Sequence, residues 1–516
     1  MSKKGAASVE VGVEVMAVRS TRVVLDETIC PAEIIICNGQ ISDIVPRRSR
    51  APASGQKVLD VGDLVVMPGI IDTHVHTCEP GHAAGEGYAF ATKAAAAGGV
   101  TTLVDMPLCR THCSGLPFPP QSAQLPAKEE GDSGNCLPPT TTLANLASKL
   151  QVAAGQCHVD VAFWGGLIPG NQEELISMLQ AGVPGFKCSL IASGVEEESP
   201  HVSLQDLHMA LNELQDRDCV LLVHAEQELG QWKPTLEPWF STTVSGHFPG
   251  SPHSDPTEYR TFLDSRPDTM EVEAIHIIAN LCLQYKVPCH ILHLSSAQAL
   301  PIIRDARQKG APLTVETAPH YLTLTAEGVP PGATSYKCCP PIRGKANQEQ
   351  LWAALQEGLI DMVISAHTPC SPDLKLLADG DFFKAQGGIA SLQFGLPLLW
   401  TSAKPRGFSL HDMVQLMCTK PASLCRLDGR KGALRPGMDA DLVIWDPDKQ
   451  FEVKKNMIQH KHQLTPFLGF QLHGEVLATL VRGRLVYLKG KFSPTPEGDL
   501  LITQTKMPVR VSSPYY

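Results

Sequence analysis

The sequence is poor in charged and aromatic residues and has no long hydrophobic run. Of its 516 residues, 19% are charged and 6% are aromatic, whereas 43% are hydrophobic. The 43 Lys and Arg residues against 53 Asp and Glu residues give a net charge of −10. These values exclude a disordered chain and a nucleic-acid binder that depends on phosphate contacts. No apolar run reaches the roughly 18 residues that a membrane span needs, so we expect no membrane association.

Regular cysteine spacing and targeting signals are also lacking. The 16 cysteines are scattered rather than arranged as a disulfide framework. Glu10 and Glu14 precede the first arginine, which is unlike a mitochondrial transit peptide, and the final Pro514-Tyr515-Tyr516 is not a peroxisomal signal. We therefore expect a reduced, soluble, intracellular protein of the cytoplasm, with a mitochondrial or peroxisomal location left open.

Short β-branched runs separated by turn residues occupy the first 66 residues, and the same style returns in residues 431–490. Asn38-Gly39 lies inside one of these runs and is typical of a hairpin turn. The two segments predict one small β-sandwich domain that is built from both ends of the chain. Residues 491–516 are expected to form a tail.

Residues 67–430 consist of short apolar runs that alternate with amphipathic stretches, a pattern typical of βα units and a parallel sheet. Eight runs are predicted as strands, at residues 65–76, 100–107, 159–167, 183–190, 219–226, 289–295, 312–317 and 360–367. The fold class is therefore α/β, with a closed (β/α)8 barrel of the TIM type. In such barrels the catalytic residues lie at the C-terminal ends of the strands. Residues 109–134, rich in Pro, Ser, Gly and Gln, are expected to be a flexible insert.

Five residues of metal-binding type fall at the ends of predicted strands. His74 and His76 are two positions apart, so both side chains face one side of the first strand. Lys187, His224 and His293 fall at the ends of the fourth, fifth and sixth strands. A lysine that has reacted with carbon dioxide carries an anionic carbamate, which can bridge two cations. Together these five residues are suited to bind two metal ions. Taken singly, each histidine could instead be an ordinary hydrogen-bonded residue, and the lysine could extend to the rim of the barrel.

Several long motifs follow one another along the chain, at residues 68–76, 79–81, 94–102, 105–108, 185–188, 293–296, 315–317, 320–324, 337–343 and 384–389. In this order they resemble the cyclic amidohydrolases, and among them most closely the allantoinases. The resemblance extends from about Met16 to about Gly490 and includes the terminal β-sandwich. It implies the hydrolysis of the cyclic amide bond of allantoin to allantoate, in purine degradation, by a hydroxide bound between two metal ions.

The resemblance also implies which residues hold the metals. Two divalent ions, usually zinc, correspond to the pair His74 and His76 and to the pair His224 and His293, with N-carboxylated Lys187 as the bridge. The expected partner is a small-molecule ureide, and the expected assembly is a homotetramer. Two weaker candidates for substrate contacts are Asn135 and Arg343, and an ion pair at the rim is an equally open role for Arg343.

The sequence departs from this family at the end of the eighth strand. The family has an aspartate there that binds one metal and moves a proton, but this chain reads Ser-Ala-His-Thr-Pro, with Ala366 in its place. The loss of acid–base help costs roughly 10² to 10⁴ in rate, so we expect impaired turnover. The insert at 109–134 splits a second motif, directly before Asn135. Two alternatives remain open: a catalytically silent allantoinase-like or dihydropyrimidinase-related scaffold, and a hydantoinase or dihydropyrimidinase.

Overall fold

The protein is seen here in a computed structural model, which describes residues 10–47, 57–81, 85–108, 138–192, 200–228 and 255–502. The expected insert at 109–134 and the candidate Asn135 lie outside the described residues. Within the described part, no helix is both long and apolar enough to pass through a bilayer.

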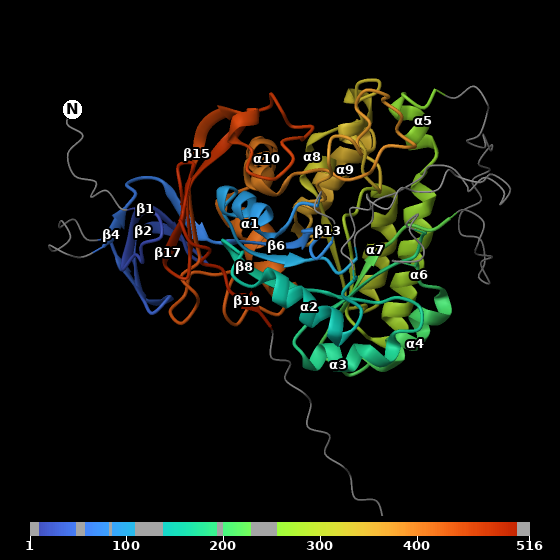
Figure 1. Ribbon diagram of the computed structural model, residues 1–516, viewed down its shortest axis with the longest axis horizontal. Coiled ribbons are helices and arrows are strands. Elements are labelled where there is room, and N and C mark those ends of the chain that lie inside the picture. Colours follow the sequence, from blue (N-terminus) through green and yellow to red (C-terminus); the bar gives the residue numbers. More distant parts are fainter. Residues whose placement is uncertain are drawn as a thin grey trace, which may run out of the picture.

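Eight parallel strand positions form a closed barrel in the middle of the molecule (Figure 1). The strands are β6 (Ile70–Val75), β7 (Val100–Asp105), β8 (Asp160–Phe163) with its continuation β9 (Gly165–Gly166), β10 (Gly185–Ser189), β11 (Val220–His224), β12 (Cys289–Ile291), β13 (Leu313–Thr317) and β14 (Met362–Val363). They pair in chain order, β6 to β8 in one sheet and β9 to β14 in another. A parallel bridge between Val75 and His367 joins the first strand to the eighth segment. The predicted barrel is therefore confirmed, and each predicted run contains one of its strands.

Helices pack around the barrel and connect its strands. They are α1 (Tyr88–Ala97), α2 (Leu143–Ala153), α3 (Leu175–Gln180), α4 (Leu204–Leu214), α5 (Tyr259–Asp264), α6 (Asp268–Tyr285), α7 (Leu300–Gln308), α8 (Pro319–Thr323), α9 (Lys345–Gln356), α10 (Gly395–Ala403), α11 (Leu410–Val414) and α12 (Lys420–Leu424). Helix α4 shows why such segments are helical: Ser203 and Asp206 form a capping box at its start. Its buried residues recur every three or four positions and form one apolar face.

The two ends of the chain meet in one sheet, where the first strands lie beside the last ones (Figure 1). Its strands are β1 (Ala17–Val24), β2 (Ile29–Cys37), β3 (Gln40–Pro46), β4 (Val58–Asp60), β5 (Val65–Pro68), β15 (Leu442–Glu452), β16 (Gln471–Val481), β17 (Arg484–Leu488) and β18 (Lys491–Phe492). Strand β5 pairs with both β1 and β15, which joins the two halves. The sheet encloses a core of its own, to which Val18, Ile34 and Leu480 belong.

Two further strands lie between residue 490, after which a tail was expected, and residue 502, the last described residue. Strand β18 pairs with β17, and β19 (Leu500–Leu501) pairs with β8 of the barrel. Glycine at position 498 lets the chain pass close to the barrel just before β19, because a Cβ atom there would lie 1.9 Å from the carbonyl oxygen of Val159. Strands of two residues are too short to show a periodicity, so β18 and β19 could not be predicted from the sequence pattern.

Candidate active site

The five residues singled out at predicted strand ends line a single pocket of the structure. His74 lies in β6, Lys187 in β10 and His224 at the end of β11, while His76 directly follows β6 and His293 lies two residues beyond β12. Their exposed fractions range from 2% to 7%. The centres of the His224 and His293 rings are 4.6 Å apart, and the His74 ring lies 5.3 Å from His293 and 5.5 Å from His76. The barrel thus brings together side chains from four strands that are far apart in the sequence.

A buried carboxylate fixes the orientation of His74. Glu316 in β13 accepts from Nδ1 of His74 at 2.7 Å, and its other oxygen lies 3.1 Å from Nε2 of His290. The backbone N–H of His293 also donates to Glu316, at 3.2 Å. Burial raises the pKa of Glu316, but His74 and His290 outweigh burial and lower the pKa to about 2. Because Glu316 is then an anion that only accepts, the proton of His74 lies on Nδ1 and the lone pair on Nε2 is left for a ligand.

The imidazoles of His74 and His76 have lowered pKa values, which suits them to bind a cation. Burial lowers the pKa of His74, and burial followed by the charge of Lys187 holds the pKa of His76 well below its ordinary range. Nδ1 of His224 and Nε2 of His293 lie 2.9 Å apart in the pocket. Lys187 is buried, and its Nζ donates to the carbonyl oxygen of Leu108 at 3.2 Å. Neutral imidazoles beside a buried lysine fit divalent ions of the zinc type.

Ala366 lines the same pocket, at the position where the family resemblance implies an aspartate. None of the described residues that line the pocket is acidic. The backbone at Ala366 has a φ of +49°, in the left-handed region that Gly, Asn and Asp adopt at the lowest cost. Asp361, on the same strand segment, is directed elsewhere: it pairs with Arg307 and accepts from the backbone N–H of Val315. No neighbouring carboxylate on this strand segment replaces the missing one.

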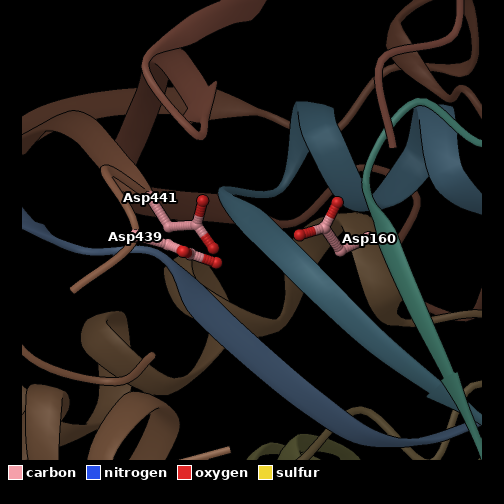
Figure 2. A group of neighbouring side chains, drawn as sticks. All are labelled: Asp160, Asp439 and Asp441. Carbon is pink, nitrogen blue, oxygen red and sulfur yellow. The ribbon is translucent and has the colours of Figure 1, made fainter. Parts of the chain in front are cut away.

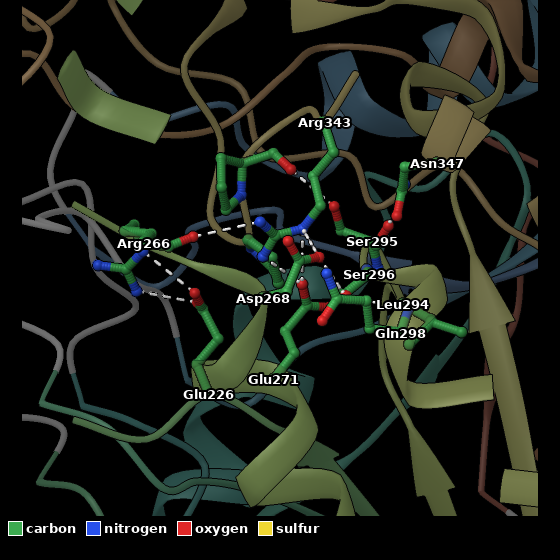
Figure 3. A network of polar contacts seen from close by, with 12 residues as sticks. Glu226, Arg266, Asp268, Glu271, Leu294, Ser295, Ser296, Gln298, Arg343 and Asn347 are labelled. Atoms are coloured by element: carbon green, nitrogen blue, oxygen red, sulfur yellow. Dashed lines mark hydrogen bonds and ion pairs between the residues drawn. The ribbon is translucent and has the colours of Figure 1, made fainter. Parts of the chain in front are cut away.

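Arg343 lies outside this pocket, in a neighbouring network of polar contacts (Figure 3). Its guanidinium donates to Glu271 at 2.8 Å and pairs with Asp268 at 3.2 Å. A further N–H donates to the carbonyl oxygen of Arg266 at 3.3 Å. The ion pair that the sequence left open is therefore present, and this placement gives no support to a substrate contact by Arg343.

His320 is a pocket residue that sequence reasoning did not single out. It lies in α8, three residues after the end of β13, and is 2% exposed. Its Nδ1 has no hydrogen-bond partner among the described residues. Burial lowers the pKa of His320 to about 3, so the ring is neutral at pH 7. Its position directly after the seventh strand was the available signal, because active-site residues of such barrels follow the strands.

Three carboxylates form a second polar cluster at the opposite end of the barrel (Figure 2). Asp160 begins β8, and Asp439 and Asp441 directly precede β15. Their spacing alone would allow a metal ion. However, Nζ of Lys431 lies 2.8 Å from Asp160, 3.0 Å from Asp439 and 2.5 Å from Asp441, so a protein cation already occupies the centre of the cluster.

The barrel, its terminal β-domain and the histidine pocket define a class of protein. The chain matches the model of the amidohydrolase family over residues 65–486 and belongs to that family.

Comparison with single proteins narrows the class. The chain is 52% identical to "Allantoinase, mitochondrial" of Aquarana catesbeiana, over 88% of this chain and 84% of the relative. It is 42% identical to the allantoinase of Streptomyces avermitilis, over 94% of this chain and 98% of the relative. Among solved structures, L-hydantoinase (dihydropyrimidinase) from Arthrobacter aurescens matches with a TM-score of 0.77 and 28% identity, over 95% of this chain and 99% of that one.

Proposed function

We propose that the protein acts on the cyclic amide bond of allantoin and hydrolyses it to allantoate. The observation that carries this proposal is the convergence of five buried metal-binding side chains in one pocket of a chain that is 52% identical to an allantoinase. The hydantoinase alternative is less favoured, because allantoinases match at 42% to 52% identity and the hydantoinase structure at 28%.

The proposed metal centre is binuclear, with zinc as the expected ion. His74 and His76 would hold one ion, His224 and His293 the other, and Lys187, N-carboxylated, would bridge them. Such ions lower the pKa of a coordinated water towards 7 and polarise the carbonyl that is attacked. The carboxylate of Glu316 fixes which nitrogen His74 presents.

The residues of the chain have further roles in the proposal. His320 lines the pocket, and its neutral ring can donate one hydrogen bond to a ureide and accept one from it. A ureide alternates N–H and C=O groups, so a neutral imidazole is a suitable contact for it. Substitution of His320 by Phe removes both hydrogen-bonding atoms and is expected to raise the KM for allantoin.

We also propose a homotetramer, which light scattering of the purified protein would test.

The missing aspartate supports a second candidate function. With Ala366 in the pocket, no described lining residue can move a proton from water to the leaving nitrogen as a carboxylate would. A catalytically silent relative that still binds metal and ureide is therefore the alternative to a working enzyme. In that case the pocket persists while turnover is lost.

Allantoin hydrolysis by the parent protein and by its Ala366→Asp variant tests both candidates. Both proteins are purified with zinc and bicarbonate, and zinc content is measured on each. We expect the variant to exceed the parent by roughly 10² to 10⁴ in rate. Equal and substantial rates would show that another group moves the proton. Absence of turnover in both zinc-loaded proteins would refute the enzyme proposal and favour the silent relative.

A further inference from the structure

The pocket has a second buried carboxylate, which lies behind His224. Glu226 follows β11 and is fully buried. Its Oε2 lies 2.8 Å from Nε2 of His224. A carboxylate accepts and does not donate, so the proton of His224 lies on Nε2 and the lone pair on Nδ1. That Nδ1 is the atom that lies 2.9 Å from Nε2 of His293.

Arg266 holds this carboxylate in place with two hydrogen bonds (Figure 3). Its Nε donates to one oxygen of Glu226 at 3.1 Å, and one terminal nitrogen donates to the other at 2.9 Å. The side chain of Arg266 is 5% exposed. A bidentate contact of this kind fixes the orientation of the Glu226 carboxylate and also pairs it with a positive charge.

The same network reaches the strand that carries His293. Arg343 donates to the carbonyl oxygen of Arg266 and to Glu271. Glu271 in turn accepts from the backbone N–H groups of Ser295 and Ser296, at 3.0 Å and 3.1 Å. These two serines lie two and three residues beyond His293. One continuous network therefore contacts the His224 imidazole, through Glu226, and the backbone two and three residues beyond His293.

The His74 side of the pocket is supported differently. Glu316, behind His74, is held by the His290 side chain and by the backbone N–H group of His293. No arginine contacts Glu316 in any hydrogen bond or ion pair of the described residues. A change at Arg266 should therefore loosen the orientation of His224 and leave the partners of Glu316, and so the orientation of His74, in place.

From this geometry we propose that Arg266 is a positioning residue for the metal site: through Glu226 it fixes His224 so that Nδ1 faces the pocket beside His293. The inference rests on the metal centre of the proposed function, but it does not require allantoin turnover. Partners of metal-binding histidines typically contribute 10- to 100-fold to metal affinity. Loss of Arg266 should therefore weaken the affinity for one metal ion by roughly 10- to 100-fold and leave the affinity for the other unchanged.

Zinc binding by the purified full-length protein tests this inference. Zinc per protomer and the affinity of each equivalent are measured by competition with a chromogenic chelator, for the parent, Arg266→Gln and Arg266→Lys. We expect Arg266→Gln to bind one equivalent roughly 10- to 100-fold more weakly while the other is unchanged. Arg266→Lys, which keeps the charge but not the two-pronged contact, should lie between them.

Arg307→Gln is the matched control, because Arg307 forms an ion pair with Asp361 and a hydrogen bond to the carbonyl oxygen of Leu313, where β13 begins, away from the pocket. It should keep both zinc equivalents. A merely structural role of Arg266 would instead lower the Tm of the metal-free protein and weaken both ions together, which would overturn the inference. Unchanged affinity for both ions would also overturn it.

If Arg266→Gln does not fold, Glu226→Asp gives the same test, because the shorter side chain withdraws the carboxylate from His224. Two tightly bound zinc ions without allantoin turnover would refute the proposed activity and leave the role of Arg266 standing. A parent protein that binds fewer than two zinc ions would overturn the inference together with the metal centre.

Discussion

Two clusters of buried polar side chains lie at opposite ends of the barrel, and they differ in how their charges are completed. At the N-terminal ends of the strands lie the three carboxylates drawn in Figure 2, and each of them forms an ion pair with Lys431. At the C-terminal ends, imidazoles and Lys187 line a pocket without a described acidic residue. In the first cluster one lysine pairs with every carboxylate, whereas in the second the imidazoles have lone pairs for a ligand from outside. Close spacing of possible ligands therefore does not identify a metal site where a protein cation already pairs with all of them.

The charges of the first cluster are consistent with this structural role. Burial lowers the pKa of Lys431, but Asp441, Asp160 and Asp439 outweigh burial and raise it above its usual value. Arg482 forms a further ion pair with Asp160. Because Asp441 precedes β15 and Asp160 begins β8, these ion pairs connect the terminal sheet to the barrel.

The largest expected effect is on stability, from the substitution Lys431→Met. It leaves three buried carboxylates without their central cation, and loss of one partner of a buried ion pair costs roughly 3–5 kcal/mol. Lys187→Met should cost the metal-free protein less, because no carboxylate in the described pocket lining depends on it. Urea unfolding of both metal-free variants measures the difference. A larger loss of unfolding free energy in Lys187→Met than in Lys431→Met would show that the pocket end of the barrel depends more strongly on its lysine.

Zinc should stabilise the protein through the pocket and not through the carboxylate cluster. A ligand at 100 times its Kd adds about 2.7 kcal/mol to the free energy of unfolding. We expect His293→Ala to remove the stabilisation by zinc and Asp439→Asn to retain it. Thermal unfolding with and without zinc measures both. If Asp439→Asn abolished the effect, the cluster around Lys431 would be the zinc site.

His460 provides a pH-dependent test of a buried imidazole whose pKa is lowered despite the nearby charge of Glu86. Its Nδ1 donates to the carbonyl oxygen of His462, and its Nε2 has no partner among the described residues. Burial, followed by the effect of His367, lowers the pKa of His460 to about 4. The unfolded chain, with a pKa near 6.5, therefore binds more protons between pH 6.5 and 4, and stability falls as the pH decreases through this range.

The low pKa of His460 reduces the free energy of unfolding by roughly 2 kcal/mol at pH 5, and this reduction vanishes near pH 7. The variant His460→Asn keeps a donor for the carbonyl oxygen but does not titrate, so it should lose less stability than the parent on acidification. Urea unfolding of metal-free protein between pH 4 and pH 7 measures this difference. Parallel pH profiles for the two proteins would contradict the assignment.

The smallest expected effect concerns the backbone at Ala366. Its positive φ is a conformation in which Asn is less strained than Ala, so Ala366→Asn should stabilise the metal-free protein by roughly 1 kcal/mol. Ala353→Gly is the control of opposite sign, because it puts glycine at an exposed position inside α9 and should cost about 1 kcal/mol. Calorimetric Tm values would distinguish them. A destabilised Ala366→Asn would mean that the pocket lacks room for the longer side chain.

The barrel and the grouping of five side chains in one pocket could be predicted from the order of the residues. Strands alternate with helices in the pattern of apolar runs, and carboxyl ends of parallel strands meet at one end of a barrel. A residue at such an end, such as His224 or His293, is thereby placed without knowledge of its neighbours. The absence of an acidic residue at position 366 was equally visible in the sequence.

The partners of these side chains depend on the packing of the folded chain and could not be predicted from the sequence. Arg343 was a candidate for substrate binding, yet its long side chain turns to Glu271 in α6 and away from the pocket. Glu226 and Arg266 are forty residues apart, and Lys431 joins residues as distant as Asp160. Such contacts depend on how helices and loops pack around the barrel, because a flexible charged side chain pairs with whichever buried group the fold brings within reach. Strand position is encoded locally, whereas the pairing of charges is a property of the folded chain.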